Sequence, residues 1–435
     1  MRAASLARYL PAEGIQLDVL TARNASAVGA DVALLREIPA EVTVHRTLTL
    51  DLPFGIRKWI KRLVKGGTHA SGDAKTTSRG ATQTLSTRLL QKALRPDPQV
   101  TWLPVLTRVA RRIITKRKID LALITVPPFS TVLLVEKLRK ALPGLPIVVD
   151  FRDEWLTTTF DLVSFVFNNT ESQRDFASRA EASGVENATA IVAVTEAARR
   201  TIRARYPEQP EHKFVFLPNG FDATRLRSAA SLPAPRRDER IVVTHVGTIY
   251  ASTEPTALVE ALQSLPSPIK ARFRLRFVGH IEEPRFRKTL LQLGEMVELV
   301  GYQPQYQALT TMNETDYVLL INHDPLNVGG KFYEYIGSGK PILGAVHPKG
   351  ETRRLLEELR AGWWAASDDV AGMRQLFLDA VGRGSPPLTS FQPDLGKIAQ
   401  YERKVLAQRY AALLHSIAGK STEPDLQKQT AHVEM

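Results

Sequence analysis

Short apolar runs alternate with segments of helical periodicity along nearly the whole chain. Runs of this length, rich in β-branched and aromatic side chains, are typical of strands that are buried on both faces of a parallel sheet. They form two series, the first at 17–21, 42–50, 119–126, 147–151, 191–195 and 214–217, and the second at 241–246, 273–278, 297–300, 317–321 and 342–346. Helical segments such as 196–205 and 256–265 lie between them. The pattern predicts an α/β protein with two Rossmann-like domains that face each other across a cleft.

Changes in composition along the chain indicate where the domains begin and end. We expect an N-terminal domain at 1–230, a Pro- and Arg-rich linker at 231–240, a second domain at 241–395, a closing helix at 396–419 and a disordered tail at 420–435. Residues 66–86 are poor in apolar side chains and rich in Gly, Ser and Thr. We therefore expect a flexible insertion there, within the first domain.

The first residues have a helical apolar face (Ala3, Leu6, Ala7 and Leu10), and the first predicted strand follows at 17–21. In the doubly wound strand order 3-2-1-4-5 the first strand is central, and a Gly-rich turn follows it. Neither feature is visible before this helical face. One alternative is that the domain has another strand order. We favour the other, a misassigned start codon or a truncated gene, and expect the N-terminal domain to lack its usual first strand.

The composition suits an ordinary globular protein of two domains. The chain has 435 residues, of which 43% are apolar and 24% are charged, so each domain has enough residues for a core of its own. The absence of cysteine excludes disulfide scaffolds, thiolate metal sites and cysteine nucleophiles. No apolar run of about 18 residues and no signal-peptide pattern is present. We expect a cytoplasmic protein.

A net charge of +13 is concentrated in two segments. Residues 87–118 carry nine basic side chains against one acidic side chain, and 56–65 carry five basic and no acidic ones. In the second segment Ile56, Trp59 and Leu63 belong to an apolar stripe at helical spacing, which is typical of a helix on an anionic membrane surface. The alternative is a helix that packs on the core with a solvated basic face. Because no nucleic-acid motif accompanies the charge, we expect no nucleic-acid partner and favour peripheral association with the inner face of the cell membrane.

The segment 329–341 carries the strongest chemical signal. Gly329 and Gly330 precede a predicted helix with Lys331 and Glu334 at its start, and Gly-Lys-Pro at 339–341 ends it. Amides at a helix N-terminus bind phosphate, an ammonium adds charge, and a carboxylate one turn further accepts from a ribose hydroxyl. The alternative is an ordinary helix–strand unit with a solvated lysine and a glycine C-cap. No carboxylate cluster has the spacing of metal ligands, so we expect neither a metal nor a cofactor.

Six motifs, taken together and in order, carry a family resemblance. They are Thr-Val-Pro-Pro-Phe-Ser at 125–130, Asp-Phe-Arg-Asp-Glu-Trp at 150–155, Leu-Pro-Asn-Gly-Phe-Asp at 217–222, His-Val-Gly-Thr-Ile-Tyr at 245–250, Phe-Val-Gly at 277–279 and the segment 331–341. The chain resembles the retaining glycosyltransferases with the GT-B fold (carbohydrate-active family 4, glycosyl transferases group 1) over nearly its whole length, except 51–86 and the tail.

The resemblance implies an activity. It is the metal-independent transfer of a sugar, with retention, from a nucleotide diphosphate sugar to an acceptor hydroxyl, as in cell-surface polysaccharide or glycolipid biosynthesis. With the basic segments, it also suggests an acceptor linked to a lipid phosphate. Two alternatives stay open. One is an inactive homologue that binds a nucleotide sugar or a partner, and the other is a sugar-nucleotide epimerase, for which we find no paired acids.

The resemblance also assigns residues to the donor site. Glu334 matches the second of two family glutamates and would bind the nucleotide ribose, whereas the first falls on Leu326. Gly329 and Gly330 would face the diphosphate. Gly247 and Thr248 occupy the donor-site turn in which the family carries an arginine and a lysine. Lys331 is then the remaining cation for the leaving diphosphate.

In the first domain the resemblance indicates a cleft site. Arg152 stands where many members place a histidine, and it can hold a phosphate or orient a carboxylate but cannot act as a base. We predict that Asp153 and Arg152 are catalytic, with Asp153 at an acceptor hydroxyl or the donor sugar. The alternative is a buried Asp–Arg pair at this strand end. Arg2 looks like the arginine that follows the family's Gly-rich loop, and we expect Arg2 and Asn219 in the acceptor cleft.

Overall fold

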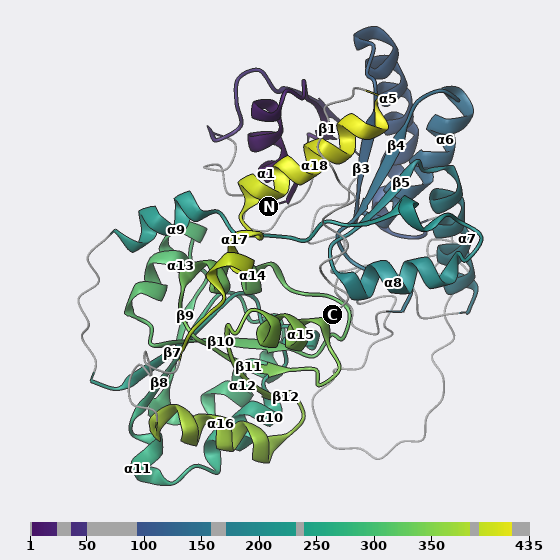
Figure 1. The fold of residues 1–435 in the computed structure, drawn as a ribbon. Coiled ribbons are helices and arrows are strands. Elements are labelled where there is room, and N and C mark those ends of the chain that lie inside the picture. The colour runs from purple at the N-terminus through teal and green to yellow at the C-terminus, as the bar shows by residue number, and fades with distance from the viewer. Residues whose placement is uncertain are drawn as a thin grey trace.

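The computed structural model describes residues 2–23, 36–49, 94–157, 171–231, 239–382 and 391–419. The predicted basic helix at 56–65, the insertion at 66–86, most of the linker and the tail lie outside these residues. Figure 1 shows two lobes, with the last long helix, α18 (Arg403–Ile417), lying across the first lobe beside α1 (Arg2–Tyr9). The predicted fold, two facing Rossmann-like domains, is confirmed.

The first lobe is built on a four-stranded parallel sheet. Its order is β3 (Ala122–Val126), β4 (Ile147–Phe151), β5 (Ala190–Ala193) and β6 (Phe214–Phe216). Ile147, Val149 and Phe151 face a core shared with α5 (Leu103–Arg117), α6 (Leu133–Ala141), α7 (Glu171–Asn187) and α8 (Glu196–Arg205). Val148 faces the other side, where α1 and α18 cover the sheet. This alternation follows from the period of two in a strand, and burial on both faces explains the continuous apolar runs.

Two further strands of this lobe form a separate sheet. β1 (Asp18–Ala22) pairs in parallel with β2 (Thr43–Thr47). Leu20 and Ala22 of β1 pack against the core of the four-stranded sheet, yet within the described ranges neither strand pairs with β3. The expected strand order places its first strand between β1 and β3. The missing strand itself stays a prediction.

The second lobe contains a six-stranded parallel sheet. Its order is β12 (Gly362–Ala366), β11 (Ile342–Val346), β10 (Tyr317–Asn322), β7 (Ile241–Val246), β8 (Phe273–Val278) and β9 (Val297–Gly301). One face packs on α10 (Thr256–Gln263), α12 (Pro284–Leu291) and α16 (Val370–Gly382). The other packs on α9 (Ala223–Ala230), α13 (Gln305–Thr311), α14 (Gly330–Ser338), α15 (Glu351–Glu358) and α17 (Leu395–Ala399).

The sequence pattern missed one strand, β12. Its sequence, Gly-Trp-Trp-Ala-Ala, has two strand-favouring tryptophans but no β-branched residue, and its glycine and alanines are depleted in strands, so its strand signal is weak. β12 is an edge strand that pairs only with β11, beginning at Ile342 opposite Gly362. Gly362 has φ +156°, and a Cβ there would lie 2.1 Å from the Ile342 oxygen, so this close approach requires glycine. Among the described residues, no helix is both long enough and apolar enough to cross a membrane.

Candidate functional site

Two strands of the second lobe, β7 and β8, are each followed by a glycine where they face the junction of the lobes. Gly247 follows β7 with φ +142°, and Gly279 follows β8 with φ +141°. A Cβ on Gly279 would lie 2.2 Å from the Gly247 oxygen, so the two backbones meet with no side chain between them. Thr248 lies in the same turn, and its carbonyl accepts from Oγ1 of Thr253 at 3.3 Å. Exposed backbone at the carboxyl ends of parallel strands is where ligands bind in α/β sheets.

Helix α14 begins beside this edge as the sequence predicts. Gly329 is its N-cap residue, and no side chain caps the helix. A Cβ built on Gly330 would meet no atom within 4 Å, so the first turn faces open space. The first amides of a helix have no intrahelical partner, and its dipole places partial positive charge there. The start of α14 is therefore suited to an anion.

Lys331 reaches from α14 to the end of β7. Its Nζ lies 3.1 Å from Nε2 of His245 and within 2.7 Å of where a Cβ on Gly247 would be. Burial lowers the pKa of Lys331 to about 8, although the charge of Glu334 raises it. Within the described residues no carboxylate forms an ion pair with Lys331. The site thus contains an enclosed cation without an anionic partner, which favours the binding of an anion.

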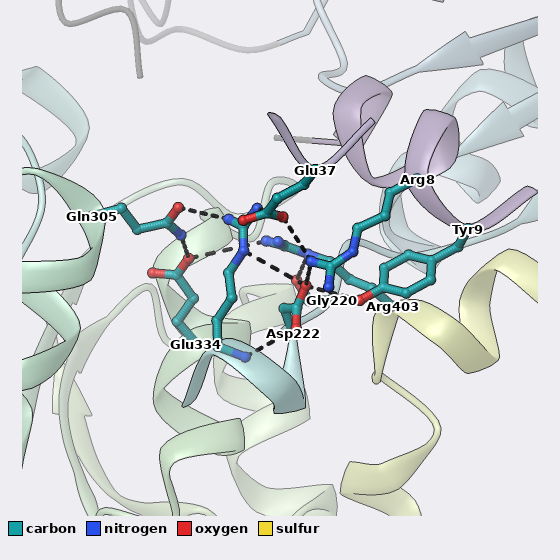
Figure 2. A network of polar contacts seen from close by, with 9 residues as sticks. Arg8, Tyr9, Glu37, Gly220, Asp222, Gln305, Glu334 and Arg403 are labelled. Carbon is teal, nitrogen blue, oxygen red and sulfur yellow. Dashed lines mark hydrogen bonds and ion pairs between the residues drawn. The ribbon is translucent and has the colours of Figure 1, made fainter. Parts of the chain in front are cut away.

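Glu334 lies one turn further along α14 and faces the junction of the lobes (Figure 2). Its Oε1 accepts from Nε2 of Gln305 at 2.8 Å and lies 4.0 Å from Nη2 of Arg403. Burial raises the pKa of Glu334 above its ordinary value, while the charge of Arg403 and the Gln305 hydrogen bond oppose this shift. The carboxylate is oriented by an amide and a cation from two other helices.

The contacts around Glu334 continue into the first lobe (Figure 2). Arg225 donates to Oε1 of Gln305 at 2.9 Å and also pairs with Glu37. Arg8 donates to Glu37 at 2.7 Å and to Asp222 at 3.0 Å. A hollow at this junction is lined by Ala4, Ser5, Arg8, Tyr9, Glu37, Asp222, Arg225 and Arg403. Glu334 is therefore connected to the first lobe through an unbroken series of polar contacts.

At the end of β4, Asp150 and Arg152 have different partners. The Asp150 carboxylate is fully buried and accepts from Nε of Arg2 at 2.9 and 3.2 Å, rather than pairing with Arg152. Arg152 donates to the Pro127 oxygen, and its buried Nε has no partner. Burial raises the pKa of Asp153, the Arg152 charge lowers it, and the charges of Asp324 and Asp150 raise it further. Asp153 and Arg152 thus lie together at the end of the sheet.

The loop after β10 bridges the lobes near Asp153. Its Leu326 oxygen accepts from Oγ1 of Thr195 at 2.7 Å, and Oδ1 of Asn327 accepts from the Glu154 amide at 3.3 Å. Asp324, which is 2% exposed, holds this loop by accepting from the amides of Leu326 and Asn327. This loop carries Leu326, the residue at which the resemblance expects the family's first glutamate, and Asp324 is a nearby carboxylate that was not predicted as a site residue.

Arg2 and Asn219 lie among contacts that join the lobes. Besides Asp150, the Arg2 guanidinium donates to the oxygens of Leu217 and Pro218 at 2.8 and 2.7 Å, and to Oδ1 of Asn219 at 3.3 Å. It also lies 5.2 Å from the centre of the Tyr410 ring on α18. Arg2 therefore holds β4, the chain between the lobes and α18 together. Its predicted acceptor role, and that of Asn219, stay predictions.

Several polar residues of this region were not found from the sequence. His245, Gln305 and Arg403 contact the predicted donor residues from elements 29 to 86 positions away in the chain. Asp324 had a local signal, since it lies two residues after the buried strand β10, at the carboxyl edge of the sheet. His245 stands in one of the six motifs, but no role was assigned to it. Within the ranges described above, no three His, Asp or Glu side chains are grouped in a way that would hold a metal ion. Metal independence stays a prediction.

Comparison with known proteins assigns the chain to a family. The model of the family described as glycosyl transferase 4-like domain matches residues 1–220, about half of the chain. No curated protein matches the sequence.

Solved structures with the same fold include a glycosyltransferase from Rickettsia africae (13% identity, 97% of this chain and 95% of that one, TM-score 0.61). HepE from Anabaena in complex with UDP and glucose is similar (15% identity, 95% of both chains, TM-score 0.61). So is sucrose-phosphate synthase from Thermosynechococcus elongatus (13% identity, 96% and 92% of the chains, TM-score 0.63). The chain belongs to the glycosyl transferase 4-like family and has the GT-B fold of these glycosyltransferases.

Proposed function

We propose that this protein transfers a sugar from a nucleotide diphosphate sugar to an acceptor hydroxyl, with retention at the anomeric carbon. The observation that carries the proposal is the Lys331 ammonium, which has no anionic partner in the described part of the chain and lies between the start of α14 and the Gly247 turn. Structures of the similar HepE contain UDP. A similar synthase from Burkholderia vietnamiensis is described as UDP-forming.

The donor would lie along the carboxyl edge of the second sheet. The amides at Gly330 and the Lys331 ammonium are suited to the diphosphate, and Glu334 to the ribose hydroxyls. As the sugar departs, negative charge develops on the diphosphate, and preorganised donors stabilise that charge. Because an ammonium and helix-terminal amides supply positive charge at this point, we propose that the transfer needs no metal ion.

The acceptor would enter from the first lobe. Asp153 and Arg152 lie at the end of β4, and the loop that carries Asp324 reaches across from the second lobe. We propose that Asp153 holds the acceptor hydroxyl or the donor sugar, and that the Arg152 guanidinium binds an acceptor phosphate. An acceptor linked to a lipid phosphate suits such an arginine.

A membrane-bound acceptor requires the protein to reach a lipid surface. α5 contains no acidic residue, and its exposed face carries the cations Arg108, Arg111, Arg112 and Lys116. Each such charge near an anionic surface contributes about 1 kcal/mol of attraction. We propose that the protein works in the cytoplasm at the inner face of the membrane, in polysaccharide or glycolipid biosynthesis. The predicted basic helix at 56–65 would add to this surface.

The ribose assignment predicts a specific loss in Glu334→Gln. Because a hydrogen bond to a charged group is worth about 1.5–3 kcal/mol, we expect roughly 10- to 100-fold weaker binding of the preferred nucleoside diphosphate. Calorimetric titration would measure this, with Glu260→Gln on the exposed face of α10 as the matched control. The 2′,3′-dideoxy analogue, which lacks the ribose hydroxyls, should bind the wild type weakly, and its affinity should not fall further in the variant. An equal loss of affinity for both ligands would show that Glu334 does not bind the ribose hydroxyls.

The activity is tested by incubating the protein with UDP-, GDP- and ADP-sugars and a polyprenyl phosphate-linked acceptor in anionic vesicles. The proposal predicts transfer from donors of one preferred base, with the anomeric configuration kept as judged by NMR. It also predicts that high salt, which screens the basic face, slows transfer in vesicles more than in detergent. Donor binding with neither transfer nor donor hydrolysis would favour the inactive homologue.

A further inference from the structure

We propose that His245 is a positioning residue that holds the Lys331 ammonium at the Gly247 turn through a neutral ring nitrogen, and so leaves the lysine charge available to the donor diphosphate. The inference rests on the proposed role of Lys331 in donor binding. His245 lies on β7, the central strand next to β10, and is fully buried. No motif or comparison assigns a role to it.

The contacts of the ring determine its protonation. Nδ1 of His245 lies 3.1 Å from the carbonyl oxygen of Leu319 on β10. A carbonyl oxygen only accepts, so Nδ1 carries the hydrogen. The other nitrogen, Nε2, then accepts from the Lys331 ammonium, which can only donate. Burial and the Lys331 charge both lower the pKa of His245 well below its ordinary value, which agrees with a neutral ring.

A neutral acceptor leaves the positive charge of Lys331 uncompensated, whereas a carboxylate would compensate it. An Asp or Glu at this position would neutralise Lys331 before the donor arrives, and the diphosphate would have to compete with it. The imidazole instead fixes the direction of the ammonium and adds no negative charge. The groups of the described chain that act on the Lys331 charge are His245 from β7 and Glu334 from α14 itself. The cation is therefore oriented but not neutralised.

The position of the ammonium follows from the same contacts. Gly247 has no Cβ, and a Cβ there would lie 2.7 Å from Nζ and 2.8 Å from Cε of Lys331. The lysine side chain thus fills the space that this glycine leaves. His245 lies on β7 two residues before Gly247, so its ring and the glycine turn both lie against the end of the Lys331 side chain. Without His245, the ammonium would have no protein acceptor among the described residues at this end of its side chain.

Two substitutions separate the two hydrogen bonds of His245. His245→Gln places an amide oxygen near the position of Nε2, keeping an acceptor for Lys331 and losing the bond to Leu319. His245→Asn places an amide NH2 near the position of Nδ1, keeping the bond to Leu319 and losing the acceptor. Both alter a buried site, so their melting temperatures report the structural cost. The His245→Gln variant is the matched control for the His245→Asn variant.

The first readout is the titration of Lys331 itself, by competitive amine labelling and mass spectrometry from about pH 6 to about pH 10. Without its acceptor the buried ammonium is less stable, so in His245→Asn the pKa of Lys331 should fall below the wild-type value of about 8. The pKa should stay near that of the wild type in His245→Gln. If Lys331 titrates identically in all three proteins, the proposal is wrong whether or not a nucleotide binds.

The second readout is the affinity for UDP, GDP and ADP from about pH 7 to about pH 9, where their phosphates are fully ionised. Affinity in the wild type should be constant below the Lys331 pKa and fall as pH rises through it, because the cation loses its proton. His245→Asn should bind roughly 10- to 100-fold more weakly at about pH 7, as expected for a lost hydrogen bond to a charged group, with His245→Gln close to the wild type. Equal affinities would overturn the proposal. If none of these nucleotides binds but the labelling shift occurs, the proposed donor role fails while the His245–Lys331 contact stands.

Discussion

Replacing Lys331 with alanine should lower kcat/KM for sugar transfer by about 10²- to 10³-fold. This is the loss seen when one donor that stabilises a developing negative charge is removed from a preorganised site. Lys331 is the cation at the junction of α14 and the Gly247 turn, and it donates a hydrogen bond there to the neutral His245. We expect kcat to fall as well as donor affinity, because the diphosphate gains charge as the sugar leaves. Transfer rates over a range of donor concentrations would separate the two effects.

The same variant should change stability little, which distinguishes a binding role from a structural one. Lys331 has no ion pair in the described structure, so its removal breaks one hydrogen bond and relieves the burial of a charge. Lys288→Ala, which removes an exposed lysine of α12, is the matched control and should leave both properties unchanged. Near-normal transfer kinetics in Lys331→Ala would exclude it from the donor site. A large fall in melting temperature would make it a structural residue.

Replacing Arg2 with alanine should lower the free energy of unfolding by about 3–5 kcal/mol. Removing one member of a buried ion pair costs this much because the other charge stays buried without a partner. Asp150 is 0% exposed and receives both of its cited hydrogen bonds from Nε of Arg2. The guanidinium also donates to the oxygens of Leu217 and Pro218 and lies against Tyr410, so β4, the chain after β6 and α18 lose a common contact. Urea unfolding followed by fluorescence would measure the change.

A surface ion pair gives the matched comparison for this prediction. Arg285 is 68% exposed and pairs with Glu283, so Arg285→Ala should cost no more than about 1 kcal/mol. A similarly small cost in Arg2→Ala would show that the Arg2–Asp150 pair does not hold the lobe together. If Arg2→Ala stays as stable as the wild type but raises KM for the acceptor alone, the predicted acceptor role would replace the structural one.

Features with a local signal were predictable from the sequence. Strands β4, β7, β8 and β11 begin and end at the predicted residues, because buried strands of a parallel sheet are rich in apolar and β-branched side chains. The bounds of α14 were predicted because its end signals are local: Gly329 is the N-cap, Gly330 is the first residue, and the left-handed Gly339 is the C-cap. Edge strand β12 has only a weak local signal, and the sequence analysis missed it.

Contacts between distant segments could not be predicted in this way. The buried Asp150 carboxylate pairs with Arg2, which lies 148 positions earlier in the chain and which no local pattern links to it. His245 and Gln305 likewise contact residues of α14 only because the fold brings β7 and the start of α13 next to that helix. A residue type indicates which contacts are chemically possible, and the topology decides which of them form.

The proposed donor site is connected to the first lobe by polar contacts. Glu334, the proposed ribose ligand, accepts from Gln305, which contacts Arg225, and Arg225 contacts Glu37 in the first lobe (Figure 2). Leu326 and Asn327 make a second bridge, next to Asp153. The proposed donor and acceptor residues therefore lie on loops and helices that already contact the opposite lobe.

The central claim is that the donor diphosphate binds at Lys331. Its most direct test is a structure of the protein with whichever of UDP, GDP or ADP binds most tightly. The diphosphate oxygens should lie within hydrogen-bond distance of Lys331 Nζ and of the amides at Gly330, with the ribose hydroxyls at Glu334. A nucleotide whose phosphates bind away from Lys331, or that occupies another part of the molecule, would contradict the claim.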